Sequence, residues 1–309
     1  MKLKFHRVLG LFLSVLMSGC TNSPPASSTA QTEPQETVAA TAIPTEQAPP
    51  LRAGLRSSSY GISPFPSPEW WLNSTTSMAA PFEDAVPSVV WIVGIVDGTT
   101  CRLNFPTETD EDYPNIITSN YWDANEAYLD AFDKAGIRVW LQVEPAGADV
   151  STLIDLTLEH YASHPSVVGF GVDVEWYKQE EYSEGKTVTD AEAQAWSEQV
   201  RSYNSEYQLF LKHWLPEKMP PTYREGTMFL DDSQMFDSLD GMVAEFVAWG
   251  EYFAPAPVGF QYGYPRDRNW WEQLATPPSD IGKRLAEEIP NLTDLYWVDF
   301  TAEEIWPQE

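Results

Sequence analysis

Residues 167–177 read VVGFGVDVEWY, a run of small and apolar residues that ends in two acids and two aromatic residues. A strand with one face in water alternates apolar and polar residues, so an unbroken apolar run predicts a strand covered on both faces. Strands of this kind are typical of parallel sheets with helices packed against them. This stretch therefore indicates an α/β protein.

Comparable runs recur along the chain. The other expected strands are Ser59 to Ile62, Ser88 to Val96, Arg138 to Val143, Leu209 to His213, Met228 to Leu230, Val258 to Gly263 and Leu295 to Val298. Helical patterns between them cover Trp122 to Lys134, Val150 to Tyr161, Asp190 to Tyr207, Phe236 to Phe253 and Asp280 to Glu288. Eight strands with intervening helices predict a (β/α)8 or TIM barrel, with a doubly wound sheet as the alternative. No glycine-rich phosphate loop follows the first strand, so nothing supports nucleotide binding.

The first twenty residues have the pattern of an export signal. Positive charges precede an apolar stretch of Val8 to Met17, and small residues stand before Cys20. This stretch is too short to span a bilayer of about 30 Å, so we expect residues 1–19 to be a cleaved signal peptide. The segment LMSGC at residues 16–20 resembles the lipobox of bacterial lipoproteins, which implies that Cys20 becomes the acylated first residue.

The segment after Cys20 has a different composition from the rest of the chain. Residues 20–56 are rich in Pro, Ser, Thr and Ala, with few large apolar residues, which predicts a disordered tether. Residues 57–309 are expected to form the barrel as a single domain. The sequence therefore predicts a monomeric protein of the bacterial cell envelope, exported and held at a membrane only by its lipid.

The charge of the chain excludes some partners. Its formal net charge is -28, and no basic stripe interrupts the acidic surface, so neither nucleic acid nor an anionic membrane surface is an expected partner. Hydrophobic residues make up 43%, enough to build a core. Cys20 and Cys101 are the two cysteines, so acylation of Cys20 would leave no disulfide, and Cys101 is expected to be a buried small side chain.

In a (β/α)8 barrel the active site lies at the C-terminal ends of the strands. Polar and aromatic residues are frequent at those positions in this chain. They are Asp97, Glu144, Asp173, Glu175, His213, Trp214, Asp231, Asp232, Gln261, Tyr262, Tyr264, Trp297 and Asp299.

The sharpest pattern among them is Asp173-Val174-Glu175. The alternation of side chains along a strand predicts that both carboxyl groups lie on one face. Mutual repulsion and partial desolvation would raise the pKa of one of them and leave a proton donor near neutral pH. Glycoside hydrolysis requires such a donor. The alternative is a pair of solvated acids at a strand end.

The same stretch resembles the fourth-strand signature of glycoside hydrolase family 18, the chitinases and endo-β-N-acetylglucosaminidases, in which a strand ends in D-x-x-D-x-D-x-E. Glu175 falls on the general acid of that family and Asp173 on the preceding Asp, while the two earlier Asp positions are Val168 and Gly171 here. The resemblance implies that Glu175 protonates the glycosidic oxygen. It also implies that Asp173 orients the 2-acetamido group of the sugar, which acts as the nucleophile.

Aromatic residues near the expected strand ends are candidates for stacking on sugar rings. Trp176, Trp214 and Trp297 are the strongest, and Trp297 is similar to the Trp that floors the sugar site in family 18. Tyr60 and Asp231 are looser matches to that family. Substrate-binding roles are further expected for Gln261, Tyr262, Glu144, Asp231 and Asp97.

These observations predict a surface-anchored glycoside hydrolase that acts on a polysaccharide or glycan and contains no cofactor and no metal. A two-carboxylate mechanism would pair Glu175 with Glu144 or Asp231 as the second group. The second hypothesis is a non-catalytic carbohydrate-binding lipoprotein, favoured by the missing acids at Val168 and Gly171. The third is a metal-dependent hydrolase that uses His213 with Asp97, Asp173 and Asp231.

Overall fold

The computed structural model describes residues 49–107, 111–119 and 121–308. The expected signal peptide of residues 1–19, the lipidation site Cys20 and the expected tether as far as residue 48 lie outside these described residues. Within them, no helix combines the length and the apolar composition that a bilayer-spanning segment needs.

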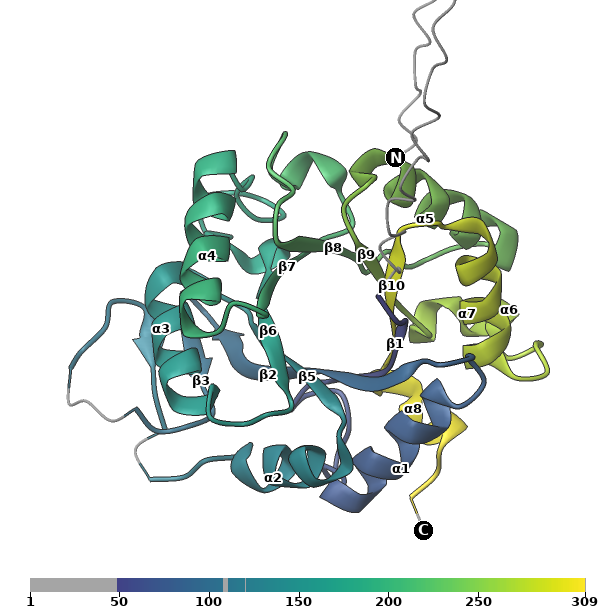
Figure 1. The fold of residues 1–309 in the computed structure, drawn as a ribbon, viewed down its shortest axis with the longest axis horizontal. Helices are drawn as coiled ribbons and strands as arrows, with labels where there is room; N and C mark the ends of the chain where they lie inside the picture. Colours follow the sequence, from purple (N-terminus) through teal and green to yellow (C-terminus); the bar gives the residue numbers. More distant parts are fainter. Residues whose placement is uncertain (1–48, 108–110, 120, 309) are drawn as a thin grey trace, which may run out of the picture. The chain divides into compact units, whose positions relative to one another are not determined.

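Eight parallel strands form a closed ring (Figure 1). In order around the ring they are β1 (Arg52–Ser57), β2 (Val86–Asp97), β5 (Arg138–Val143), β6 (Val167–Asp173), β7 (Gln208–Lys212), β8 (Thr227–Asp231), β9 (Val258–Tyr262) and β10 (Leu292–Val298). The ring closes because β1 pairs with β10 on one side and with β2 on the other. The expected (β/α)8 barrel is therefore confirmed, and the doubly wound sheet is excluded.

Helices surround the ring on its outer side (Figure 1). They are α1 (Pro68–Ala79), α2 (Glu126–Ala135), α3 (Val150–Tyr161), α4 (Asp190–Tyr203), α5 (Leu239–Phe253), α6 (Arg268–Trp271), α7 (Pro277–Glu288) and α8 (Ala302–Ile305). Outside the barrel, the end of β2 pairs antiparallel with β3 (Thr100–Leu103), and β3 pairs with β4 (Ile116–Ile117).

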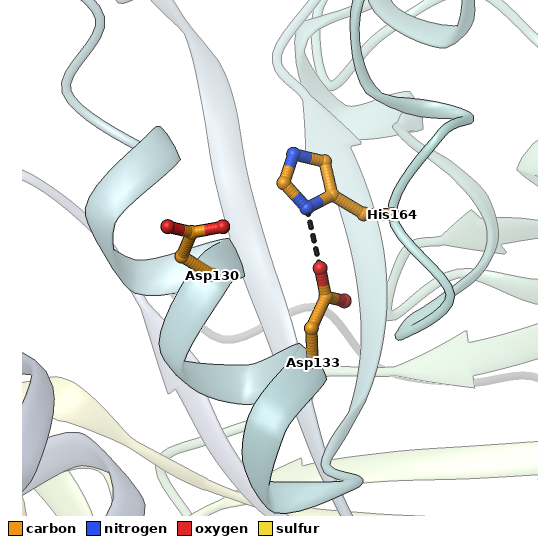
Figure 2. Close-up of side chains that lie close together, drawn as sticks. All are labelled: Asp130, Asp133 and His164. Carbon is orange, nitrogen blue, oxygen red and sulfur yellow. Dashed lines mark hydrogen bonds and ion pairs between the residues drawn. The ribbon is translucent and has the colours of Figure 1, made fainter.

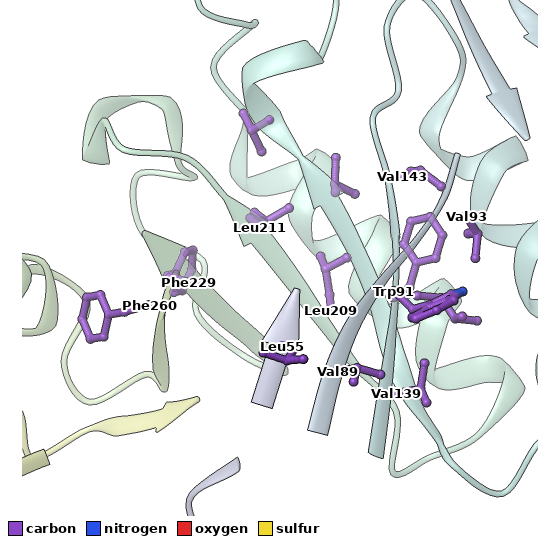
Figure 3. Packing of buried hydrophobic residues seen from close by; sticks show 14 of the residues in the cluster. Leu55, Val89, Trp91, Val93, Val139, Val143, Leu209, Leu211, Phe229 and Phe260 are labelled. Atoms are coloured by element: carbon purple, nitrogen blue, oxygen red, sulfur yellow. The ribbon is translucent and has the colours of Figure 1, made fainter. Parts of the chain in front are cut away.

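Two apolar cores explain why the strands are apolar on both faces. The inner core fills the barrel with Val90, Trp140, Phe210, Met228, Leu230 and Tyr296. The outer core joins the strands to the helices, and Figure 3 shows part of it. Cys101 belongs to this outer core and is buried and free, as expected. Inside the barrel, the Trp140 indole donates to Asp294 at 3.2 Å, and Asp294 pairs with Arg52 at 2.8 Å.

Local capping signals explain where two helices begin. The Asp149 carboxylate accepts from the backbone N–H of Thr152 at the start of α3. Thr189 and Glu192 form a reciprocal capping box at the start of α4, which satisfies backbone donors that a helix start otherwise leaves unpaired. Both helices start at the residues that the sequence predicts.

The first strand differs from the prediction. It spans Arg52–Ser57, whereas residues 59–62, expected as strand, form a turn. The barrel therefore begins inside the segment assigned to the tether, before the expected boundary at residue 57. The apolar signal of β1 is weak because only Ala53 and Leu55 pack into the outer core, whereas Arg52 and Arg56 contact acids on β10 and after it.

Candidate active site

A cavity of about 260 Å³ lies at the C-terminal ends of the barrel strands. It is lined by Arg56, Tyr60, Val96, Glu144, Asp173, Glu175, Trp176, Lys212, Asp232, Gln234, Tyr264 and Phe300. Seven residues that the sequence analysis names as candidates are among them, namely Tyr60, Glu144, Asp173, Glu175, Trp176, Asp232 and Tyr264. The polar character of this lining distinguishes the cavity from the apolar interior of the barrel.

The two acids of the Asp173-Val174-Glu175 pattern reach the cavity in different ways. Strand β6 ends at Asp173, and Val174–Trp176 form a 3-10 turn, so Glu175 is not on the strand face of Asp173 as expected. Asp173 is buried at the strand end, and the turn brings Glu175 to the same cavity, where it is half-buried. The prediction that the two carboxyl groups share a site therefore agrees with the geometry, although alternation along the strand is not the cause.

Lys212, at the end of β7, holds two of the acids. Its Nζ lies 2.8 Å from Oδ2 of Asp173 and forms a second ion pair with Asp232. The side-chain amide of Gln142 donates to the same Asp173 oxygen at 3.3 Å. Lys212 is not among the residues predicted for the site, because a lysine that ends an apolar strand, LFLK, gives no signal of a site in the sequence. Its inward direction follows from Phe210, two residues earlier, which belongs to the inner core.

A second chain of contacts starts at Arg56, at the end of β1. Its Nη1 lies 2.7 Å from Oδ1 of Asp299, and its Nη2 donates to the Tyr60 hydroxyl at 2.7 Å. The Tyr60 hydroxyl in turn donates to Oε1 of Glu144, while the backbone N–H of Val96 donates to Oε2 at 2.9 Å. Glu144 is thus fixed in place as an acceptor at both oxygens.

The loops that carry Glu144 and Glu175 are tied to each other by Lys178. Its backbone N–H donates to the carbonyl of Ala146 at 2.8 Å, and its ammonium donates to the carbonyl of Gly147 at 2.9 Å. The loop after β5 and the turn after β6 are therefore fixed relative to each other, which preorganises the two carboxyl groups.

The cavity holds more acids than bases. Burial raises the pKa of Glu175, and the nearby charges of Asp232 and Glu144 raise it further, although Lys212 opposes them. Burial also raises the pKa of Asp173 well above its ordinary value. Burial opposes the charge of Lys212, but Asp173 and Asp232 together raise its pKa well above the usual range. The site therefore contains an ammonium whose charged form is stabilised and two carboxyl groups, Asp173 and Glu175, whose pKa values are raised.

Two of the predicted sugar-binding aromatic residues lie elsewhere. Trp297 is fully buried in the outer core, where its indole donates to Thr301 at 2.9 Å and its ring packs against Tyr262 and Trp271. A Cβ at Gly263 would lie 2.3 Å from the Trp297 ring, so the ring sits directly on that backbone. Tyr262 is also buried and donates to the carbonyl of Pro278 at 2.9 Å. Side chains alternate along a strand, and Trp297 and Tyr262 lie on the faces of β10 and β9 that point outward, toward the helices.

Other expected site residues are also outside the cavity. Asp97 is exposed in the hairpin and pairs with Arg102, because β2 continues beyond the barrel. Asp231 follows Leu230 of the inner core and so points away from the barrel axis. Trp214 is half-buried against His213. Gln261 is buried and does not line the cavity, but it accepts a hydrogen bond of 3.3 Å from Tyr264, which does.

His213 cannot serve as the metal ligand of the third hypothesis. Its Nδ1 accepts the backbone N–H of Leu215 at 2.9 Å, and its Nε2 donates to the carbonyl of Glu184 at 2.9 Å. Both ring nitrogens are thus occupied by the backbone. Burial lowers the pKa of His213, which agrees with this neutral tautomer.

Among the described residues, one group brings three ligating atoms within 4.8 Å of one another, namely Asp130, Asp133 and His164 (Figure 2). These atoms already have partners. His164 Nδ1 lies 2.7 Å from Asp133, and its Nε2 lies 3.4 Å from Glu126. Asp130 faces Lys134 at 3.6 Å. The cluster joins α2 to the turn before β6 and does not form an open site.

The closed parallel ring, with its helices outside and its polar cavity at the strand ends, defines a (β/α)8 barrel of the kind that carries active sites. No protein-family profile matches the sequence, and no curated protein sequence is significantly similar to it. The comparison with solved structures gives a crystal structure from Bacteroides thetaiotaomicron, provisionally assigned as an α-L-fucosidase. It matches with a TM-score of 0.54 at 10% identity, over 90% of this chain and 97% of that one.

A β-glucuronidase from Parabacteroides merdae matches with a TM-score of 0.48 at 13% identity, over 81% of this chain. The matched part spans 31% of the length of that glucuronidase. At these identities the likeness shows the fold alone.

Proposed function

We propose that the protein is a glycoside hydrolase that cleaves a polysaccharide or glycan, with Glu175 as the general acid. The observation that carries the proposal is the placement of Glu175 in a cavity at the barrel mouth with Glu144, Asp173 and Asp232. Burial raises its pKa, as the proton donor to a glycosidic oxygen requires. Trp176 also lines the cavity, and an indole ring can stack on a sugar ring.

Glu144 is the proposed second carboxylate. Of the two candidates from the sequence, Asp231 lies outside the cavity, whereas Glu144 lines it. Its two oxygens accept from Tyr60 and Val96, contacts that suit an ionised carboxylate, which still has further acceptor positions. Glu144 would act either as the nucleophile or as the base that activates water, depending on its separation from Glu175 in the complex.

The substrate-assisted mechanism of family 18 receives less support. That family places an acid at the position of Gly171, but a Cβ there would lie 2.0 Å from Cζ of the Phe210 ring. The Phe210 ring therefore takes the space that such a side chain would need, and Lys212 and Gln142 contact Asp173 instead. The sequence resemblance is therefore the support for an N-acetylhexosamine substrate, and no contact of a described cavity residue adds to it.

The cellular setting is part of the proposal. The export signal and Cys20 favour a lipid-anchored enzyme of the bacterial cell envelope that meets glycans outside the cytoplasm. The strongly acidic composition suits a soluble exported domain.

The test is a screen of oligosaccharides and polysaccharides with the wild-type protein, Glu175→Gln and Glu287→Gln. Glu287 is exposed on α7, so its substitution makes the same charge change far from the cavity. We expect the wild type and Glu287→Gln to release reducing ends from the same glycan. Glu175→Gln should lose about 10²- to 10⁴-fold in rate, the usual contribution of a general acid. Full activity in Glu175→Gln would reject the assignment.

The alternative of a non-catalytic carbohydrate-binding protein is distinguished by the same screen. It is favoured by the missing acids at Val168 and Gly171, and it predicts glycan binding without turnover. Cleavage that depends on Glu175 excludes it.

A further inference from the structure

The surroundings of Lys212 contain more hydrogen-bond acceptors than donors. An ammonium offers three N–H donors, and Lys212 directs two of them to Oδ2 of Asp173 and Oδ2 of Asp232. The other carboxylate oxygen of each acid, Oδ1, is buried and has no hydrogen-bond partner among the described residues. Oε1 of Gln142, whose amide contacts Asp173, is also buried without a partner.

Each of these acceptors belongs to a side chain with almost no exposure. Asp173 is 1% exposed, Asp232 is 6% exposed and Gln142 is fully buried. Asp173 and Asp232 both line the cavity. Leaving a buried acceptor unpaired costs about 1–3 kcal/mol, and more for a charged group, so a ligand that brings donors would be favoured here.

The charge of the site points in the same direction. Glu144, Asp173, Glu175 and Asp232 line the cavity against Arg56 and Lys212, and Asp299 already neutralises Arg56. Lys212 is therefore the cation that faces four carboxyl groups, although burial raises the pKa of Asp173 and of Glu175 and so favours their neutral forms. A positively charged ligand would reduce this excess, whereas a ligand with a carboxylate would increase it.

A divalent metal ion fits this site less well than an organic cation. The acids of the cavity do not form a group with three ligating atoms within 4.8 Å among the described residues, and the Lys212 ammonium stands between Asp173 and Asp232. The volume of about 260 Å³ is close to the lower end of the range of about 300–1,000 Å³ for ligand pockets, so the expected ligand is small.

From these contacts, and on the basis of the proposed function, we infer that the cavity binds a sugar with a free amino group. The charged amine of a 2-amino-2-deoxyhexose would bind beside Asp173 and Asp232, whose side chains line the cavity. Its charge-assisted hydrogen bonds are about twice as strong as those between neutral groups, so an N-acetylated or 2-hydroxyl sugar would bind more weakly. The glycan substrate would then be a deacetylated, cationic one.

Proton release accompanies such binding. Burial raises the pKa of Asp173 well above its ordinary value in the free protein, and a bound ammonium would favour its ionised form. The titratable groups near Asp173 are Lys212, Asp232, Glu175, Glu144, Tyr60 and Tyr264. Binding of an amino sugar should therefore release protons, and binding of a neutral sugar should not.

The test is calorimetry with the methyl glycosides of glucosamine and galactosamine, compared with their N-acetyl and 2-hydroxyl counterparts, in mildly acidic buffer where the amine is charged. Two buffers of different ionisation enthalpy report the protons released. We expect at least one amino sugar to bind about tenfold more tightly than its neutral counterparts, with proton release. Asp232→Asn should remove most of this preference, whereas Glu287→Gln should keep it. Equal or weaker binding of the amines, or no binding of any of these sugars, overturns the inference.

The outcome separates this inference from the proposed function. Glu175-dependent hydrolysis of neutral glycans without a preference for amines would overturn the inference and leave the proposed function intact. Selective binding of an amino sugar by a protein that cleaves no glycan would support the inference and reject the proposed function.

Discussion

Lys212 is the residue on which the electrostatics of the cavity depend. It is 3% exposed and pairs with two buried acids, so its removal would leave both without a cation. We predict that Lys212→Met lowers the free energy of unfolding by about 3–5 kcal/mol, the usual result of breaking a buried ion pair at one partner. Chemical denaturation measures this difference.

The control for this substitution is Lys134→Met, because Lys134 is exposed and pairs only across one helical turn with Asp130. Its expected effect is below about 0.5 kcal/mol. Adding Asp173→Asn and Asp232→Asn to Lys212→Met should restore part of the lost stability. A Lys212→Met protein as stable as the wild type would show that the acids do not need this cation.

The raised pKa of Glu175 has a consequence for the rate. A general acid works in its protonated form, so kcat/KM should fall as pH rises through that pKa. Asp232 is one of the negative charges that raise it. We predict that Asp232→Asn lowers the pKa of Glu175 and moves the alkaline limb of the pH profile to lower pH. An unchanged limb would mean that another group supplies the proton.

Asp231 is a buried acid with no role in the proposed chemistry. Its Oδ2 has no hydrogen-bond partner among the described residues, and burial raises its pKa well above the ordinary value. A group whose folded-state pKa is raised stabilises the fold at low pH and loses that contribution as pH rises through the folded-state value. The stability of the wild type should therefore fall with rising pH more steeply than that of Asp231→Asn. Parallel curves from denaturation at a series of pH values would contradict this reading.

At the scale of the elements, strand β6 is constrained by the ring of Phe210 on β7. Gly171 faces that ring, and an added Cβ would lie 2.0 Å from it. We predict that Gly171→Ala destabilises the barrel by about 1–3 kcal/mol, the usual cost of overpacking a core. Thermal unfolding checks this prediction.

Gly241 provides the matched control on helix α5. It is exposed, and an added Cβ would meet only the Ser238 hydroxyl at 3.5 Å. Gly241→Ala should be neutral or stabilising because Ala has the higher helix propensity. Similar melting temperatures for the two variants would show that the space around Gly171 is not restrictive.

Elements with strong local signals could be predicted from the sequence. Strand β5 and helix α3 have the expected bounds, because a mostly apolar run marks the strand and a capping Asp149 marks the start of the helix. The expected range of the first strand is wrong because the arginines of β1 pair with Asp294 on β10 and Asp299 just after it, far away in the sequence. That pairing exists only in the closed ring.

The candidate site was predictable in part for a related reason. The strand-end rule found Glu144, Asp173 and Glu175, since acids after apolar runs are visible in the sequence. The same rule is wrong for Trp297 on β10 and Tyr262 on β9. Both strands are apolar on both faces, and the sequence does not show which face points to the helices. Basic residues such as Lys212 at the end of an apolar run left no signal at all.

At the scale of the whole molecule, the amino-terminal sequence predicts attachment to a membrane through lipid. We expect Cys20→Ser to abolish incorporation of labelled fatty acid and to move the protein from the membrane fraction to the soluble fraction. Cys101→Ser should keep the label, since Cys101 is buried in the outer core. Labelling that survives Cys20→Ser would reject the lipobox.

We propose that this barrel is a glycosidase in which Glu175 protonates the leaving group. The most direct measurement compares the rates of cleavage by Glu175→Gln and by the wild type on two substrates. One is an unactivated glycan, and the other is an aryl glycoside of the same sugar, whose leaving group needs no proton. We predict a loss in kcat/KM of about 10²- to 10⁴-fold for the glycan and little loss in kcat/KM for the aryl glycoside, because kcat/KM does not include the later step in which a retaining enzyme uses the same residue as a base. Equal losses on both substrates, or no loss on the glycan, would contradict it.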